Sequence, residues 1–283
     1  MRDAQPSQTA LMAAAARAAH LIVDAEPFLF RDTLAARLLG GAADEPIGYH
    51  RRFGEHPILA GTRAQVTTRS AYTERRAAKA AEAGVRHHVL LGAGLDTYAW
   101  RARPEVRVIE VDHPDTQRWK RELMAAAGLD QPQGPAFAPL DFETGDLPRA
   151  LRAAGPGDGE PAFVSWLGVT MYLTEEAVAA TLGVLGRLPA GSELVMEYAL
   201  PPGLRDGRGA AYAEQAAGAA AERGEPWLSF FAPDDLTALL KRHGLEVTEH
   251  VRQADCVDPA LWQRGDALRP SDVCRLVHAR VTA

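Results

Sequence analysis

The sequence predicts a doubly wound α/β fold, in which a mostly parallel sheet carries helices on both of its faces. From residue 88 onward, short apolar runs alternate with helical segments, which is the order of strands and crossover helices in such a sheet. The first run ends in a glycine turn, Gly92-Ala93-Gly94, and the second run ends in an acid, Asp112. A glycine turn followed after about 20 residues by an acid is typical of nucleoside binding.

The first 83 residues are predicted to be mainly helical. The expected helices are residues 9–21, 34–39 and 62–83. Ser7 and Asp32 precede the first two helices, and side chains of this kind accept hydrogen bonds from a first helical turn. Residues 44–60 contain two prolines and several aromatic side chains, so an irregular segment is expected there. We divide the chain into an N-terminal helical lid, residues 1–60, and an α/β domain, residues 61–283.

Strands and helices alternate through the rest of the chain. The expected strands are residues 88–92, 106–111, 136–140, 162–167, 193–198, 245–251 and 273–281, and the expected helices are 114–127, 145–154, 174–187 and 233–243. The last strands favour an antiparallel strand at the edge of the sheet. Residues 201–226 form a polar, Gly/Ala-rich insertion. Together with the lid, this insertion is expected to cover the strand ends, where ligands bind in this fold.

Composition and charge narrow the class of protein. A chain of 283 residues with a net charge of −6 lacks the basic surface that nucleic acids and anionic membranes attract. No apolar run approaches the roughly 18 residues of a membrane span. Cys256 and Cys274 are too far apart for a paired motif, and no His/Cys cluster suggests a metal. We expect a cytoplasmic protein whose partner is a small molecule; its oligomeric state stays open.

The chemistry of the glycine turn separates two classes of nucleoside cofactor. A dinucleotide site favours a glycine at position 97 and no acid in the loop, because two phosphates lie on the helix N-terminus. This chain has Thr97 at that position and Asp96 within the turn. A carboxylate repels a pyrophosphate but attracts an ammonium or a sulfonium. S-adenosylmethionine has both cations and no phosphate and is therefore favoured; the alternative is that Asp96 only caps the following helix.

Four motifs of this chain resemble, in order, those of the leucine carboxyl methyltransferase family. They are Leu91-Gly-Ala-Gly-Leu-Asp-Thr97, Glu110-Val-Asp-His-Pro114, Asp141-Phe142 and Leu167-Gly-Val-Thr-Met-Tyr-Leu173. The resemblance runs from about residue 7 to the C-terminus, and it is closest to the bacterial branch of small-molecule O-methyltransferases. It implies the class I methyltransferase fold, which is Rossmann-like, with helices added before the first strand. It also implies that S-adenosylmethionine is the cofactor.

The resemblance further implies a set of cofactor-binding residues. At matching positions these are Gly92, Gly94 and Asp96 for the methionine moiety, Asp112 for the ribose, Asp141 and Phe142 for the adenine, and Arg69, with Arg17 as a second candidate, for the methionine carboxylate. A guanidinium suits a carboxylate because it can donate two parallel hydrogen bonds. Asp141 as the cap of a local turn, and both arginines as ordinary solvated side chains, stay open as alternatives.

One position departs from the family pattern. The family usually has a glutamate where this chain has Leu167, and without it Asp96 has a larger share in binding the amino group of the cofactor. This departure keeps open a protein that binds S-adenosylmethionine without transferring methyl groups, such as a cyclase, an isomerase or a ligand-responsive module. A nicotinamide-dependent oxidoreductase shares the sheet and the ribose acid, but Asp96 and Thr97 disfavour it.

The acceptor chemistry is constrained by the available bases. An alcohol must lose a proton to become a nucleophile, whereas a carboxylate is already ionised at neutral pH. His113 and Tyr172, and also Tyr198, are the candidate bases near strand ends, although for His113, which precedes Pro114 at a helix start, orientation of the loop is the favoured role. No His/acid pair has a convincing spacing. We therefore expect methyl transfer to an oxygen of a small organic molecule, with a carboxyl favoured over a hydroxyl and secondary metabolism as a fitting context.

Overall fold

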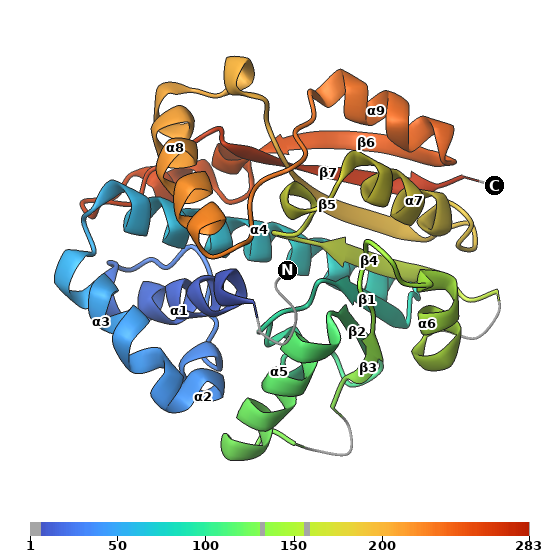
Figure 1. Cartoon of the computed structure of the whole chain (residues 1–283), viewed down its shortest axis with the longest axis horizontal. Coiled ribbons are helices and arrows are strands. Elements are labelled where there is room, and N and C mark those ends of the chain that lie inside the picture. Colours follow the sequence, from blue (N-terminus) through green and yellow to red (C-terminus); the bar gives the residue numbers. More distant parts are fainter. Residues whose placement is uncertain (1–6, 131–133, 156–158, 283) are drawn as a thin grey trace.

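The computed structural model describes residues 7–130, 134–155 and 159–282, which include a seven-stranded sheet enclosed by helices (Figure 1). The strands, in the order in which they pair, are β3 (Ala136–Pro139), β2 (Arg107–Asp112), β1 (His87–Leu91), β4 (Ala162–Trp166), β5 (Glu193–Ala199), β7 (Cys274–Val281) and β6 (Leu245–Arg252). Strands β1 to β5 pair in parallel, and β7 runs antiparallel to both β5 and β6. The predicted mostly parallel sheet is confirmed; the antiparallel strand lies one position in from the edge.

The sheet has its topological switch point at β1. Strand β1 pairs with β2 on one side and with β4 on the other, so the chain builds outward from β1 to β3 and then returns to build in the opposite direction. Ligands of open α/β sheets bind at the carboxyl ends of the strands at such a point. The glycine turn follows β1 and Leu167 follows β4, so the fold brings both to this place.

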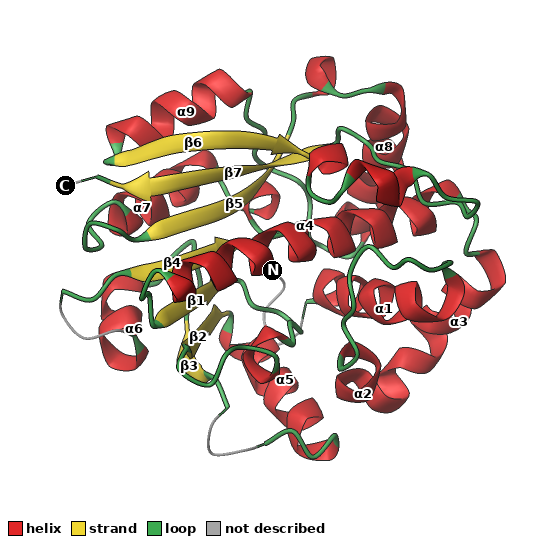
Figure 2. Ribbon diagram, turned by 180° about the vertical axis from the view of Figure 1, so that it is seen from behind, coloured by secondary structure: helices red, strands yellow, loops and turns green. Residues whose placement is uncertain are grey.

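Two apolar clusters, one on each face of the sheet, hold the covering helices. One cluster contains side chains of α6 (Leu147–Ala154), α7 (Glu175–Leu185) and α9 (Pro233–Arg242), and the other contains side chains of α4 (Pro57–Glu82). Helix α4 crosses the sheet in the view of Figure 2. Because successive side chains of a strand point to opposite faces, β1 contributes Val89 to the first cluster and Leu90 to the second.

The remaining helices gather beyond the carboxyl ends of the parallel strands (Figures 1 and 2). They are α1 (Gln8–Val23), α2 (Ala35–Leu39), α3 (Asp44–Phe53), α5 (Pro114–Ala126) and α8 (Gly207–Glu222). A third apolar cluster packs Ala14 of α1 and Leu38 of α2 against Met124 of α5 and Leu95 of the glycine turn. The N-terminal helices therefore pack directly on the turn.

Most predicted elements are found within a few residues of their expected ends, and the Ser7 cap is confirmed by a 3.1 Å hydrogen bond from Ala10 N to Ser7 Oγ. The irregular segment predicted for residues 44–60 is wrong, because α3 occupies most of it. Pro46 lies in the first turn of α3, where no intrahelical partner for its missing N–H is needed.

Two further observations bear on the predicted organisation. Helix α4 begins at Pro57, so the predicted boundary after residue 60 lies inside a helix. The insertion at residues 201–226 contains α8, which Asp206 caps by accepting from Gly209 N at 2.6 Å.

Within the described ranges no helix is long and apolar enough to cross a bilayer. Both cysteines are buried free thiols.

Candidate functional site

The glycine turn after β1 has a shape that only glycine permits. Gly92 and Gly94 have φ angles of +66° and +50°, in the left-handed region. A Cβ atom added at Gly92 would lie 2.2 Å from Cγ2 of Val169, so any side chain there would displace the segment after β4. The turn is also tied to β2, because Gly92 N donates to the carbonyl oxygen of Val111 at 2.7 Å. The turn is therefore held between β2 and the segment after β4 that contains Val169.

Asp112, at the end of β2, is hydrogen-bonded to the backbone of this turn. Its Oδ2 accepts from Gly94 N, and its Oδ1 accepts from His113 N at 2.6 Å. The carboxyl is 8% exposed, and burial raises its pKa above the ordinary value. A carboxylate has about four acceptor positions, so both oxygens keep capacity for ribose hydroxyls. A buried acid that is only partly satisfied by backbone donors fits a diol ligand.

Asp96 lies in the turn with its carboxylate half-buried. Its Oδ1 accepts from Tyr98 N at 2.6 Å, which closes a local turn and gives Asp96 the capping role considered as the alternative. That bond occupies one oxygen, so it does not remove the negative charge from the turn. The role of Asp96 toward a cationic cofactor stays a prediction.

Arg69 projects from α4 toward the segment that follows β4. Its Nη1 donates to Glu197 Oε2 at 2.7 Å, and a Cβ atom added at Gly168 would lie 2.6 Å from the same nitrogen. Although burial lowers the pKa of Arg69, the Glu197 carboxylate raises it above the ordinary value, so the guanidinium stays charged. The side chain remains 15% exposed. Arg69 is thus a charged donor beside the switch point, as an arginine that binds a carboxylate would be.

Glu197 holds Arg69 in place and was not found from the sequence. It is fully buried in β5, where its Oε1 also accepts from Gln65 Nε2 at 2.5 Å. The available signal was a charged residue in the interior of the strand, where residues 194–199 are otherwise apolar or aromatic. A buried acid in such a strand needs a charged partner, because an unpaired ionised carboxylate would be too costly there. Leu167 offers no polar atom and packs on the apolar cluster beneath α4.

Arg17, on α1, contacts the backbone of the glycine turn. Its side chain is buried, and its hydrogen bonds are made to Asp32 and to the carbonyl oxygen of Leu95. Arg69 and Arg17 were both candidates for the methionine carboxylate. The geometry favours Arg69, because Arg17 is more deeply buried and two of its nitrogens, Nε and Nη2, donate to the protein.

Asp141 and Phe142 follow β3, where the adenine is expected. Asp141 closes its own turn, accepting from Glu143 N and from Thr144 Oγ1, each at 3.0 Å. Phe142 stacks on Trp166 at 6.1 Å between ring centroids. The turn role of Asp141 matches the alternative raised for it, and an adenine-binding role stays a prediction for both residues.

The three candidate bases, His113, Tyr172 and Tyr198, are poorly placed to accept a proton. His113 caps α5 through Nδ1, which accepts from Asp115 N at 3.3 Å. In the tautomer that accepts at Nδ1, the imidazole carries its proton on Nε2, so neither nitrogen is a free base while this cap is intact. Nδ1 also lies 3.6 Å from Asp115 Oδ2. Burial raises the pKa of Tyr172, so its phenolate is costly to form. Tyr198 is fully buried and hydrogen-bonds to His250.

The fold and the turn chemistry point to a class I, S-adenosylmethionine-dependent methyltransferase, and the comparisons with known proteins show this class. The family model for leucine carboxyl methyltransferases matches residues 10–186. The chain is 31% identical over 306 aligned residues to YktD of Bacillus subtilis, named as a candidate S-adenosyl-L-methionine-dependent methyltransferase, and the alignment covers 99% of each chain. The chain therefore belongs to the leucine carboxyl methyltransferase family.

Two solved structures share the fold. A DUF574 family protein from Streptomyces avermitilis aligns with a TM-score of 0.60 at 19% identity, covering 95% of this chain and 97% of that one. A candidate methyltransferase from Thermobifida fusca aligns with a TM-score of 0.60 at 22% identity, covering 91% of this chain and 97% of that one. At these identities the likeness concerns the fold alone, and it extends over the N-terminal helices as well as the sheet.

Proposed function

We propose that this methyltransferase acts on an oxygen of a small organic molecule, with a carboxylate as the acceptor. The observation that carries this proposal is the state of the candidate bases: His113 Nδ1 accepts a hydrogen bond in the cap of α5, and burial raises the pKa of Tyr172. A carboxylate needs no base, because its ordinary pKa of about 4 leaves it ionised at neutral pH.

An aromatic group beside the switch point supports a small acceptor. Tyr172, Tyr212, Trp227 and Phe230 pack in one cluster, which the insertion at residues 201–226 and the segment after it supply together with the turn Thr170–Tyr172. Leu228 N donates to the carbonyl oxygen of Met171 at 2.6 Å, which binds this segment to the turn. Val169, the preceding residue, touches Gly92. The aromatic cluster is therefore connected to the cofactor turn through a few residues.

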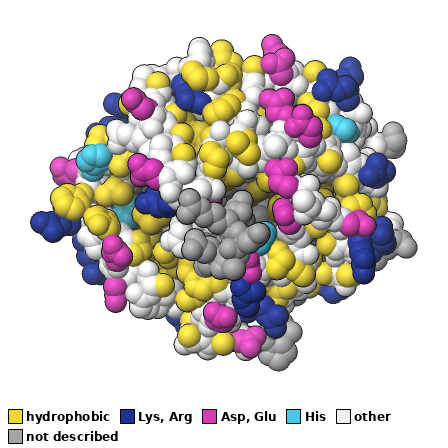
Figure 3. Space-filling model, viewed as in Figure 1, with side chains coloured by type: hydrophobic (Ala, Val, Ile, Leu, Met, Phe, Trp, Pro, Cys, Tyr) yellow, Lys and Arg dark blue, Asp and Glu magenta, His cyan; other side chains and the backbone are white. Residues whose placement is uncertain are grey.

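The elements that cover the strand ends are also joined to each other. Thr9 N, in the first turn of α1, donates to Glu225 Oε2 at 3.1 Å. Thr62 and Tyr212 share a 3.0 Å hydrogen bond between α4 and α8. Such a cover excludes water and suits a small ligand better than a macromolecule. Over the described residues of the face in Figure 3, acidic and basic side chains are interspersed, and this pattern is unlike the continuous basic track of a nucleic-acid site.

The chain's own groups have simple tasks in this reaction. S-adenosylmethionine supplies an electrophilic methyl group on a cationic sulfur. Asp112 would hold the ribose and Arg69 the carboxylate, so that the methyl-bearing end is fixed relative to the protein. Alignment of two reactants in a closed site can supply about 7–11 kcal/mol of a barrier without any acid or base. Displacement by an ionised oxygen requires no proton transfer. This agrees with the observation that His113 Nδ1 accepts a hydrogen bond in the cap of α5.

The chemical stability of the product distinguishes the acceptors. The enzyme is incubated with methyl-labelled S-adenosylmethionine and matched pairs of small aromatic and aliphatic acids and alcohols. We expect label in the acids as methyl esters, which release labelled methanol on mild alkaline treatment. Label that resists alkali, as an aryl or alkyl methyl ether does, would overturn the carboxylate proposal and leave a hydroxyl acceptor.

The pH dependence of turnover gives an independent prediction. With a carboxylate acceptor at saturating cofactor, we expect a rate that is flat from about pH 6 to 8, since the acceptor is ionised throughout. A histidine base would instead make the rate rise through roughly pH 6.5. The His113→Ala variant should keep the flat profile. A sigmoid in the wild type that disappears in this variant would make His113 the base after all.

A further inference from the structure

A buried polar network lies behind the glycine turn and joins it to the N-terminal helices. Thr97 Oγ1 donates to Asp32 Oδ1 at 2.7 Å. Arg17 donates through Nε to Asp32 Oδ2 at 2.9 Å and through Nη2 to the carbonyl oxygen of Leu95 at 2.8 Å. Asp32, which lies between α1 and α2, is thus bonded to both α1 and the turn, and we call these three side chains the Arg17–Asp32–Thr97 network.

This network is closed to ligands. Arg17 is 6% exposed, Asp32 1% and Thr97 0%. Although burial raises the pKa of Asp32, the charges of Arg17 and Arg101 lower it below its usual range, so the carboxylate stays ionised. An ionised acceptor strengthens the hydrogen bond from Thr97. Any influence of the network on the cofactor therefore passes through the backbone of the turn.

The turn needs support of this kind because its glycines can adopt several backbone conformations at little cost. Gly92 and Gly94 adopt left-handed angles, and other conformations cost glycine little. The N–H of Gly94 must point at Asp112 for that acid to be held where the ribose is expected. If the turn is correctly folded for only a fraction of the time, the apparent cofactor affinity falls to that fraction of its intrinsic value.

We propose that Asp32 and Arg17 are positioning residues of the cofactor site. Through their hydrogen bonds to Thr97 and to the carbonyl oxygen of Leu95, they hold the turn at residues 92–97 in its binding-competent conformation. The N-terminal helices are then a structural part of the cofactor site as well as a cover for the acceptor. Ala10 of α1 supports this, because a Cβ atom added at Gly94 would lie 3.1 Å from its side chain. The inference rests on cofactor binding alone and is independent of the identity of the acceptor.

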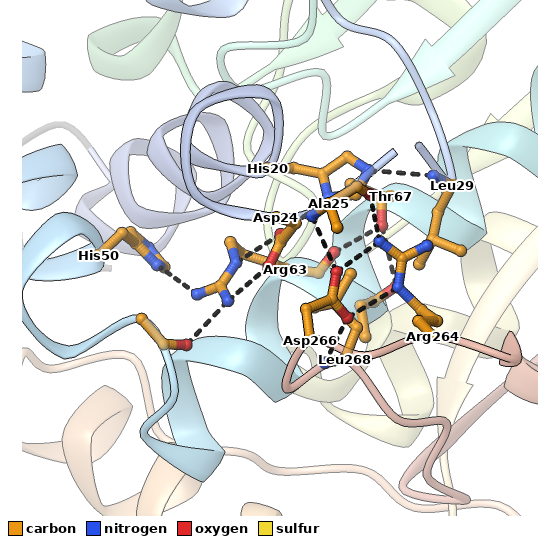
Figure 4. Close-up of polar contacts among 12 residues, drawn as sticks. His20, Asp24, Ala25, Leu29, His50, Arg63, Thr67, Arg264, Asp266 and Leu268 are labelled. Atoms are coloured by element: carbon orange, nitrogen blue, oxygen red, sulfur yellow. Dashed lines mark hydrogen bonds and ion pairs between the residues drawn. The ribbon is translucent and has the colours of Figure 1, made fainter. Parts of the chain in front are cut away.

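The same helical segment provides a matched control on its other side. Asp24 pairs with Arg63 at 2.7 and 2.8 Å and hydrogen-bonds to His20, and all three side chains are buried (Figure 4). The backbone next to Asp24 bonds to the C-terminal part of the chain, since Ala25 N donates to Asp266 Oδ2 at 2.9 Å. The Asp24 side chain is therefore as buried and as well paired as that of Asp32, but its partners Arg63 and His20 lie outside the glycine turn.

The test compares Asp32→Asn with Asp24→Asn in the full-length protein. Both variants should lower the free energy of unfolding, because each leaves a buried arginine without its carboxylate. Only Asp32→Asn should weaken the binding of S-adenosylhomocysteine measured by calorimetry, by about tenfold, as expected if roughly nine-tenths of the turns lose the competent conformation. Equal losses of affinity in the two variants, or no loss in either, would overturn the proposal.

Thr97 provides a test that keeps the buried charges intact. Thr97→Val is nearly isosteric and removes the hydroxyl, which donates to Asp32 and accepts from Arg101 Nε at 3.3 Å, whereas Thr97→Ser keeps it. We expect Thr97→Val to weaken binding several-fold and Thr97→Ser to restore most of the affinity. Hydrogen exchange at the amides of residues 94–97 should quicken in Thr97→Val. Unchanged affinity in a folded Thr97→Val protein would refute the positioning role even if Asp32→Asn fails to fold.

Discussion

Replacing Asp112 by alanine should weaken the binding of S-adenosylhomocysteine by on the order of a hundredfold or more. The variant loses two hydrogen bonds from ribose hydroxyls to a charged acceptor, and each such bond contributes about 1.5–3 kcal/mol. It also frees the N–H of Gly94, which Asp112 orients in the folded protein. Isothermal titration calorimetry of the wild type and the variant measures the ratio of dissociation constants directly.

Asp141→Ala is the matched control for this prediction. Its carboxylate bonds to Glu143 and Thr144 within its own turn, and a single amine contact with the adenine is all that it would lose to the cofactor. We expect a loss of affinity that is smaller than that of Asp112→Ala. Equal affinity of the wild type and Asp112→Ala would contradict the placement of the ribose at the end of β2.

Replacing Arg69 by methionine should have two large and separable effects. The fully buried Glu197 would lose its charged partner, and breaking such a pair from one side costs about 3–5 kcal/mol of the free energy of unfolding. The cofactor would lose the guanidinium expected to bind its carboxylate. Chemical denaturation and calorimetric binding report the two effects independently.

The double variant Arg69→Met, Glu197→Gln separates stability from binding. Neutralising Glu197 removes the uncompensated charge, so the free energy of unfolding should recover most of its loss. Cofactor affinity should not recover, because no cation replaces Arg69. Recovery of both quantities would show that Arg69 has a structural role alone, and affinity equal to wild type in the single variant would exclude it from the cofactor site.

Much of the fold could be predicted because it follows from local patterns. The apolar run at residues 88–91, the glycines after it and the acid at 112 each report a neighbouring strand or turn, and the structure has all of them. Helix α3 was missed because its proline, glycine and exposed aromatics hide its periodicity. Its helical state depends on Ile47 and His50, which are buried in the packed structure.

The site was predictable where its residues are close in sequence and obscure where they are not. The motif from Gly92 to Asp112 was found because its spacing is short. Arg17 reaches Leu95 across 78 positions, and Asp32 reaches Thr97 across 65. No local pattern reports contacts of that range, so Asp32 was interpreted only as a helix cap, which it also is. Glu197 was assigned to a strand with no role, because its partners come from α4.

The most direct measurement is a calorimetric titration of the full-length protein with S-adenosylhomocysteine and, separately, with NAD. The acid at position 96 and the threonine at position 97 favour a cofactor without a pyrophosphate. We predict that S-adenosylhomocysteine binds to a single site and that NAD binds far more weakly. Tighter binding of NAD than of S-adenosylhomocysteine would contradict the assignment of the glycine turn and of the residues around it.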